Sequence, residues 1–321
     1  MTSPEIIFTG AIVADLVAAT VPRDLPPGET IFIDHVELAV GGNAAIAAIS
    51  ASRLGAAVHV AGLVGDDTLG EILLSRLQAE GIETSLVQVL EGEKTSKTMA
   101  LARHGGERTL LHCSGANSRS IADRLLPAIL RYDSAAVFSL SGAEIMQAVR
   151  DGEALELVRS AKSQGLTTAF DTTYPPRELD YGTFVAELAP HIDFFFTSMG
   201  EATLFSESAD LLATAQFLQA AGARTVIIKD GPRGALALDG SGQAIYCTTP
   251  QVDAIDTTGA GDNFVGAFLA QYAGTGSLAA ALKLAVSAGA LSVQHLGGQA
   301  QYTAEQARDL SDALTIETKS V

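Results

Sequence analysis

One run of seven residues combines a flexible backbone with a carboxylate: Asp-Thr-Thr-Gly-Ala-Gly-Asp over residues 256–262. Gly259 and Gly261, on either side of Ala260, allow a sharp turn and a close approach of the backbone to a ligand. A helix is predicted to follow at once, so its unpaired N–H groups and the positive end of its dipole suit a phosphate. Asp262 lies beside that anion site, where it can accept the proton of an attacking hydroxyl or serve only as a helix cap.

A second glycine-containing string is formed by Gly41, Gly42 and Asn43. It precedes an alanine-rich apolar stretch, Ala44 to Leu54, which ends at Gly55 and predicts a buried helix. Paired glycines bring the backbone close to a ligand, and the Asn side chain can both donate and accept hydrogen bonds. A Gly-Gly turn before a helix is common, so this string alone indicates only a candidate binding loop.

The third string, Gly62 to Gly70, contains two neighbouring acids, Asp66 and Asp67. We interpret these acids mainly as turn and cap residues rather than as ligand contacts. The residues from Thr68 to Glu71 match the S/T-x-x-E pattern of a capping box, which predicts that Thr68 opens a helix.

The elements that must position these strings follow a regular order from about residue 116 onward. Short apolar strands, such as 135–140, 167–170, 194–197 and 225–229, alternate with helix-length segments such as 278–293. Repeated strand-then-helix order predicts a largely parallel sheet covered by helices.

Two insertions, near residues 12–40 and 93–115, interrupt that alternation. The first contains prolines and a strand-like piece, Thr30 to Asp34, and the second reads as a hairpin with its turn at 105–107. The two insertions can pair as a small sheet outside the main layer.

Composition limits the partners of the chain, which has 321 residues and a formal charge of −17. This negative charge disfavours nucleic acids and anionic membrane surfaces, and the apolar stretch from Ala44 to Gly65 is interrupted by charge, which argues against a membrane span. An anionic cosubstrate therefore needs a local positive site. Only two cysteines, Cys113 and Cys247, are present and no signal peptide is evident, so we expect a cytoplasmic protein without disulfides.

In this order and spacing, the three strings resemble the PfkB carbohydrate kinase family, also called ribokinase-like, over nearly the whole chain. The resemblance implies a doubly wound α/β core, mostly parallel and flanked by helices, with a small β-sheet lid over the sugar site. We expect the core to comprise 1–11, 41–92 and 116–321, and the lid 12–40 and 93–115. It also implies transfer of the ATP γ-phosphate to a hydroxyl, assisted by Mg²⁺.

The same resemblance assigns roles to individual residues. Asp262 is the expected base, and the backbone of Gly259, Ala260 and Gly261 is the expected anion hole. The expected substrate residues are Asp15, Gly41, Gly42, Asn43, Asn117 and Asp171. Nucleotide contacts are expected from Ser198, Lys229, Gly231 and Gly234. Glu201 is expected to act on Mg²⁺ through water. Asp256 and Thr258 are expected at a site for a monovalent cation such as K⁺, and carbonyl groups of residues 293–298 are expected to complete that site.

The chain departs from the family pattern in several places. Ser198 replaces an Asn that the family usually carries three residues before Glu201, Thr173 replaces an Asn after Asp171, and Ile46 replaces a second Asn of the sugar site. The apolar side chain of Ile46 implies that a polar contact to the sugar is absent or comes from elsewhere. Lid residues Arg108 and His112 can also reach a substrate.

Other functions fit the sequence less well. The first strand is not followed by the Gly-x-Gly-x-x-Gly of dinucleotide-dependent oxidoreductases, and no Walker motif is present. A non-catalytic ligand-binding relative and a nucleoside kinase remain alternatives, although Phe32 is almost the only aromatic residue available in the lid to stack on a base. We therefore expect a kinase for a sugar or sugar acid, and a homodimer formed through exposed lid edges.

Overall fold

The computed structural model describes residues 5–321 except 20, 104–107, 133–135, 207 and 300. Its larger sheet has ten strands in the order β14-β13-β12-β11-β10-β9-β8-β1-β4-β5. The strands are β1 Glu5–Gly10, β4 Ala57–Gly65, β5 Glu83–Leu90, β8 Val137–Ser141, β9 Thr167–Asp171, β10 Phe194–Ser198, β11 Thr225–Lys229, β12 Ala235–Leu238, β13 Gln243–Cys247 and β14 Ile316–Ser320.

The pairings from β5 through β1 to β11 are all parallel, and β12 to β14 continue the sheet in antiparallel fashion. From β1 the chain first builds one side, β4 and β5, and then crosses to β8 and builds the other. The prediction of a doubly wound, mostly parallel sheet is therefore confirmed. Such a reversal leaves a crevice at the carboxyl ends of the strands, where ligands bind.

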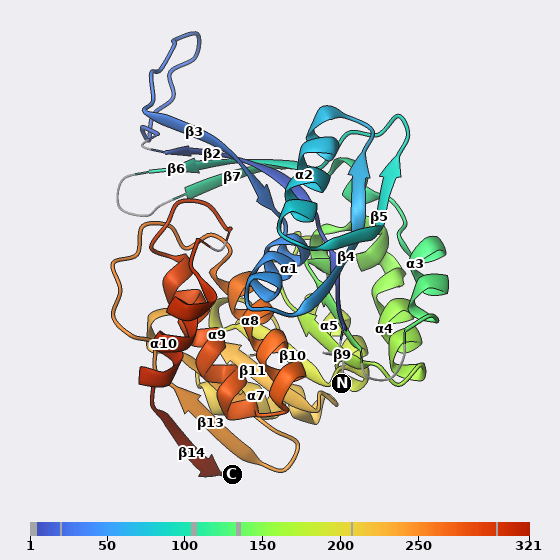
Figure 1. Cartoon of the computed structure of the whole chain (residues 1–321), viewed down its shortest axis with the longest axis vertical. Coiled ribbons are helices and arrows are strands. Elements are labelled where there is room, and N and C mark those ends of the chain that lie inside the picture. Colours follow the sequence, from blue (N-terminus) through green and yellow to red (C-terminus); the bar gives the residue numbers. More distant parts are fainter. Residues whose placement is uncertain (1–4, 20, 104–107, 133–135, 207, 300) are drawn as a thin grey trace.

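Helices cover both faces of the large sheet (Figure 1). They are α1 Asn43–Arg53, α2 Thr68–Ala79, α3 Ala122–Ile129, α4 Ala154–Ser163, α5 Tyr181–Leu188, α6 Met199–Ala202, α7 Leu211–Ala220, α8 Ala260–Thr275, α9 Leu278–Ser292 and α10 Ala304–Ala313. Ile6 and Phe8 of β1 pack with α1, α8 and α9, whereas Ile7 between them packs with α3 to α5. Alternate residues of one buried strand thus supply both cores, because successive side chains point to opposite faces.

The two insertions form a second sheet of four strands, which lies at the upper left in Figure 1. Its order is β3-β2-β6-β7, with β2 Val13–Ala19, β3 His35–Gly41, β6 Lys97–Ala102 and β7 Arg108–Cys113. The predicted pairing of the insertions is confirmed, since β2 of the first runs parallel to β6 of the second. The predicted hairpin turn at 105–107 lies outside the described residues.

Two local predictions were wrong. Residues Thr30 to Asp34 form no strand, because they belong to a projecting loop that has no neighbouring strand to pair with; Phe32 there is 93% exposed. Helix α2 begins at Thr68 as predicted, and the interpretation of the acids as cap residues is confirmed for Asp67, whose carboxylate accepts the N–H of Gly70; the expected capping box with Thr68 as the cap is wrong. The Thr95 backbone N–H and hydroxyl also donate to Asp67, which ties the start of this helix to the second insertion.

Helix α8 packs closely against α1, and Gly266 makes this possible. A Cβ atom at this position would lie 2.2 Å from the Ala47 carbonyl oxygen and 2.8 Å from Ser50 Cβ. Gly266 stands one turn after Asp262, on the same side of the helix. The close packing therefore helps to place Asp262 over the start of α1.

Replacing Gly266 by Ala should destabilise the protein by about 1–3 kcal/mol, because α1 and α8 must separate to admit the methyl group. Gly274 in the same helix is the matched control, since a Cβ there meets nothing within 4 Å. We expect Gly274→Ala to gain up to about 1 kcal/mol from helix propensity. Urea unfolding of both variants measures the difference, and destabilisation of equal size in the two would contradict this account of the helix contact.

Candidate active site

The predicted anion site is a tight turn at the start of α8. Gly259 has the left-handed backbone angle φ of 69°, and an added Cβ would lie 2.7 Å from Gly298 Cα. The Asn263 side chain donates to the carbonyl oxygens of both glycines at 2.8 Å, which ties the turn to the distant segment. Ala260 and Gly261 line a neighbouring cleft. The first turn of a sixteen-residue helix thus faces the cleft with its positive dipole end.

The structure brings Asp262 and Asn43 together across 219 residues of sequence. Asn43, the first residue of α1, donates its side-chain N–H to Asp262 Oδ1 at 2.8 Å. Asp262 is only 9% exposed. Gly142 lies beneath this pair, and a Cβ there would lie 2.5 Å from Asn43 Oδ1. The amide therefore orients the carboxylate that the sequence singled out.

Asp15 extends from β2 of the small sheet toward the same space. A Cβ on Gly41 would lie 2.0 Å from Asp15 Oδ2, so only glycine fits at that position. Burial raises the pKa of Asp15 to about 6; the Thr98 hydroxyl opposes this rise, and the negative charges of Asp262 and Asp256 add to it. Gly42 forms the other side of the loop with a φ of 92°. The predicted substrate residues Asp15, Gly41 and Gly42 therefore surround one space together with Asp262.

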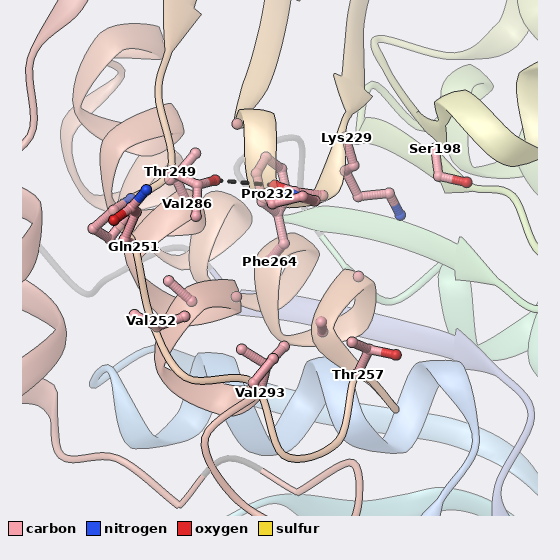
Figure 2. A pocket seen from close by; sticks show the side chains of 18 of the residues that line it. Ser198, Lys229, Pro232, Thr249, Gln251, Val252, Thr257, Phe264, Val286 and Val293 are labelled. Atoms are coloured by element: carbon pink, nitrogen blue, oxygen red, sulfur yellow. Dashed lines mark hydrogen bonds between the residues drawn. The ribbon is translucent and has the colours of Figure 1, made fainter. Parts of the chain in front are cut away.

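A cleft of about 1010 Å³ opens beside the start of α8 (Figure 2). Lys229 and Ser198 lie at one side of this cleft, and Gln251 and Val252 lie at the other. Its apolar wall consists of Pro232, Val252, Phe264, Val286 and Val293. An apolar slot next to a cationic, glycine-lined end suits a nucleotide, because the base and the phosphates need opposite surroundings.

Lys229 is the cation at that end. Its ammonium lies 2.5 Å from Asp171 Oδ1 and 3.1 Å from where a Cβ on Gly261 would be. Burial by itself lowers the pKa of Lys229, but the negative charges of Asp171 and Glu201 outweigh burial, and the pKa is raised. The ammonium therefore stays charged beside the helix start. Asp171, 2% exposed, acts here as the partner of Lys229.

Ser198 and Glu201 close the first turn of α6 as a reciprocal capping box. Glu201 Oε2 accepts both the Ser198 backbone N–H and the Thr172 hydroxyl at 2.9 Å. Both residues of the box line the cleft. Serine in place of asparagine thus keeps this carboxylate fixed at the cationic end.

The acidic residues at the cleft suit Mg²⁺ that is bound mainly by phosphates and water, with a single protein carboxylate nearby. Within the described parts of the chain, no group of three or more His, Cys, Asp or Glu side chains could hold a metal. Mg²⁺ commonly binds through one or two carboxylates together with substrate phosphates and water. Glu201, fixed at the phosphate end of the cleft, meets that requirement.

Asp256 joins the glycine-rich run to the segment after α9. Its Oδ1 accepts the N–H and hydroxyl of Thr258, and its Oδ2 accepts the Gly297 N–H at 3.0 Å. The N–H groups of Ile255 and Asp256 also donate to the Val293 carbonyl oxygen. The two segments that the resemblance assigned to a monovalent cation therefore lie side by side.

The structure also places three further residues that the sequence predicted to contact nucleotide or substrate: Gly231, Gly234 and Asn117. Gly231 and Gly234 line the cleft, and Gly234 has a φ of 112° with no room for a Cβ against the Cys247 carbonyl oxygen. Asn117 is 1% exposed and donates to the Ile12 carbonyl oxygen at 3.1 Å. It thus fastens the start of the small sheet, and its contact with a substrate stays a prediction.

Sequence reasoning missed the apolar wall of the cleft. Phe264 and Val286 have the helical spacing of ordinary core residues, and Val252 lies in a loop. It also missed Glu144, which is fully buried and accepts bonds from the Thr173 N–H and the Tyr181 hydroxyl. Burial raises the pKa of Glu144 to about 8. No residue spacing in the sequence indicates the apolar wall or the buried Glu144, because each is formed by segments that are distant in sequence and come together only in the folded protein.

The site combines a glycine-rich turn at the start of a helix with a nucleotide-sized cleft, and both lie at the carboxyl ends of the strands of a doubly wound sheet. This combination defines a phosphate-binding enzyme of the α/β class. The family model of the pfkB family carbohydrate kinases matches residues 3–305. The chain therefore belongs to this family of phosphotransferases, and the resemblance noted in the sequence is confirmed.

Relatives and solved structures agree with the family. A ribokinase of Haemophilus influenzae is 29% identical over 306 residues, which cover 92% of this chain and 94% of that protein. A putative ribokinase from Agrobacterium tumefaciens superposes with a TM-score of 0.83 at 24% identity, over 97% of this chain and 98% of that one. Arabidopsis thaliana ribokinase, solved with ribose and ATP, has a TM-score of 0.78 at 21% identity, over 97% and 99%.

Among the described residues, no helix is long and apolar enough to cross a bilayer.

Proposed function

We propose that this enzyme transfers the γ-phosphoryl group of ATP to a hydroxyl of a sugar or sugar acid, with Asp262 as the general base. The observation that carries the proposal is the position of Asp262. It lies in the first turn of α8, is oriented by Asn43, and stands between the space bounded by Asp15 and the phosphate end of the cleft. An acceptor hydroxyl on one side can thus face a phosphoryl group on the other.

Each group at the site has a separate task. Asp15 and Asn43 hold the acceptor, and Asp262 takes the proton of its hydroxyl during in-line attack. The backbone of residues 259–261 and the Lys229 ammonium offset the negative charge that grows on the transferred group. ATP with Mg²⁺ supplies the phosphoryl group, and Glu201 would hold the ion through water. The small sheet covers the acceptor and excludes water that would otherwise hydrolyse ATP.

The sugar-like acceptor is supported by the relatives named ribokinase. Ile46 is 2% exposed, and a Cβ on Gly298 would lie 2.6 Å from its Cδ1. Its side chain thus packs under the glycine-rich turn and is not available to the acceptor. The polar contact that an asparagine would make must therefore come from another element.

A panel of pentoses, hexoses, sugar acids and nucleosides, assayed for ADP release and for the phosphorylated product, tests the proposal. We expect at least one sugar-type acceptor to react much faster than any nucleoside. Preference for a nucleoside would establish the runner-up, a nucleoside kinase. ATP binding without turnover of any hydroxyl compound would overturn the catalytic role altogether.

The metal requirements are part of the proposal. Removal of Mg²⁺ by EDTA should abolish turnover, and its return should restore it. Exchange of K⁺ for a large organic cation should lower activity if residues Asp256 and Thr258 with the 293–298 segment bind a monovalent ion. Equal rates in both salts would remove that site from the proposal. The free thiols Cys113 and Cys247 fit a reducing cytoplasm, where we place the enzyme.

A homodimer through the small sheet is supported by an apolar row across it. Leu38, Leu16, Met99 and Leu111 stand in register on four neighbouring strands. Met99 and Leu111 are 47% and 55% exposed, which is unusual for a contiguous row of large apolar side chains. A second copy of the sheet would cover this row and its edges.

We expect Leu111→Lys to convert the dimer into a monomer, because an ammonium group cannot be buried unpaired in an apolar interface. Leu130→Lys is the matched control, since Leu130 is equally exposed, at 57%, and lies after α3 rather than on the small sheet. Sedimentation velocity measures both. A wild-type monomer, or a dimer that survives Leu111→Lys, would contradict the assignment of the interface.

A further inference from the structure

The face of the small sheet that is turned toward the active site has a row of three polar residues. Asp15 of β2 pairs in register with Thr98 of β6, and Thr98 pairs with His112 of β7. Residues directly opposite one another on neighbouring strands point to the same face. Asp15 faces Asp262, so Thr98 and His112 extend the same polar row over the acceptor space.

The three side chains are neighbours along this row. The Thr98 hydroxyl lies close enough to Asp15 to stabilise the charged carboxylate, and Thr98 Oγ1 lies within hydrogen-bond distance, 3.1 Å, of His112 Nδ1. A hydroxyl has one proton to donate, and the carboxylate is the stronger acceptor. With the hydroxyl proton turned toward Asp15, Thr98 Oγ1 is the acceptor of the second bond, and its proton is assigned to His112 Nδ1. This order leaves Nε2 as the free end of the imidazole.

The chemical character of Nε2 follows from the state of the ring. His112 is an exposed residue, but neighbouring side chains remove part of the water around its ring, which lowers its pKa and favours the neutral imidazole. With the proton on Nδ1, Nε2 of the neutral ring is a hydrogen-bond acceptor. Across the described residues, Nε2 bonds to no protein group. An acceptor on this face therefore calls for a donor from the ligand, and a hydroxyl group is such a donor.

The rest of this face supports an uncharged ligand. Val17, Ala39 and Ala100 are buried and apolar and surround the polar row. The acidic groups that bear on this face are Asp15 in the row, Asp262 and Asp256 acting on it, and Glu37, which pairs with Val17. Among the described side chains of this face, which do not include that of Arg108 at the outer end of β7, none is a Lys or Arg. A carboxylate on the ligand would therefore meet like charge from these acids.

We propose that Thr98 and His112 determine the specificity of the enzyme for its acceptor. His112 Nε2 accepts a hydrogen bond from a sugar hydroxyl remote from the one that is phosphorylated, and Thr98 couples that contact to Asp15. The enzyme therefore selects a neutral polyhydroxy sugar over the corresponding sugar acid. This inference rests on the proposed kinase function and narrows its substrate class. It also identifies the element that supplies the polar group which Ile46 cannot offer to the sugar.

The test compares steady-state kinetics of the wild type, His112→Ala and Thr98→Val. Wild-type kcat/KM should favour the neutral sugar over its acid by at least about tenfold, because the acid forgoes a hydrogen bond and adds repulsion. Each variant should raise KM for the sugar by roughly 3–10-fold, the value of one hydrogen bond. The kcat and the KM for ATP should change less than about twofold, because neither residue touches the phosphoryl group.

The double variant should raise KM no more than the larger single change, because the two residues act through one chain of bonds. His35→Ala is the matched control, since His35 lies at the outer end of β3, half-exposed and paired with Glu37. It should leave all three constants unchanged.

The outcomes separate the two proposals. No turnover of any sugar by the wild type overturns the kinase function itself. Turnover with unchanged sugar KM in both variants, or faster turnover of the acid than of the neutral sugar, overturns the role of Thr98 and His112 and leaves the kinase function standing. A rise in the KM for ATP equal to that for the sugar would show general damage to the fold, and likewise counts against the specificity role.

Discussion

Asp262→Asn should lower kcat by roughly 10²–10⁴-fold, which is the usual contribution of a positioned general base. The substitution keeps the shape of the side chain, and its remaining oxygen can still accept the Asn43 N–H that now meets Asp262 Oδ1 at 2.8 Å. The fold and the affinity for ATP should therefore hardly change. Quenched-flow or steady-state turnover gives kcat, and calorimetry gives the ATP affinity.

The matched control for this variant is Asp210→Asn. Asp210 is also an acid at the start of a helix, where its carboxylate accepts the Ala213 N–H at 2.8 Å, and Asn is an equally good cap. It should leave kcat unchanged. If Asp262→Asn retained most of the wild-type kcat, the proton would have to leave by another route and Asp262 would have only a structural role.

Lys229→Met should reduce both turnover and stability. Loss of a cation beside the anion site should lower kcat by roughly 10²–10³-fold, as for removal of one transition-state donor. Loss of the partner of buried Asp171 should also destabilise the fold by about 3–5 kcal/mol, because the carboxylate is left uncompensated. Activity assays and urea unfolding measure the two effects separately.

A second substitution separates the two roles of Lys229. In Lys229→Met with Asp171→Asn, no buried charge remains, so stability should largely recover while turnover stays low. Lys162→Met is the matched control. Lys162 pairs with Asp193 at the same 2.5 Å, but it is 41% exposed and lies near the amino ends of the strands, away from the active site. It should cost about 1 kcal/mol or less and leave kcat intact. Restored turnover in the double variant would show that Lys229 is only structural.

Local sequence identified the elements that carry the chemistry. Glycines 259 and 261 and the apolar pattern after them predicted the turn and helix α8, and alternation of strands and helices predicted the parallel sheet. These predictions succeed because φ freedom and hydrophobic periodicity act over a few residues. The small sheet was also foreseen, since its strands interrupt that alternation.

Where local signals competed, the sequence was a poorer guide. Two cap candidates stood side by side at the start of α2, and the structure selects Asp67 over Thr68, with Thr95 of the second insertion also donating to the Asp67 carboxylate. The strand-like composition of Thr30 to Asp34 was real, yet a strand forms only where a partner strand lies alongside. The missing strand thus depended on a distant segment, whereas the cap was chosen between two neighbouring residues.

By itself, therefore, the sequence determined the family, the doubly wound core and the string that ends in Asp262. Only the tertiary structure decided that Asn43 orients Asp262, that Lys229 pairs with Asp171, and that Asp15, Thr98 and His112 form one row across the small sheet. The physical reason is the same throughout. Helices and turns follow from short-range sterics and periodicity, whereas a binding site is made by side chains whose encounter depends on how distant strands are paired.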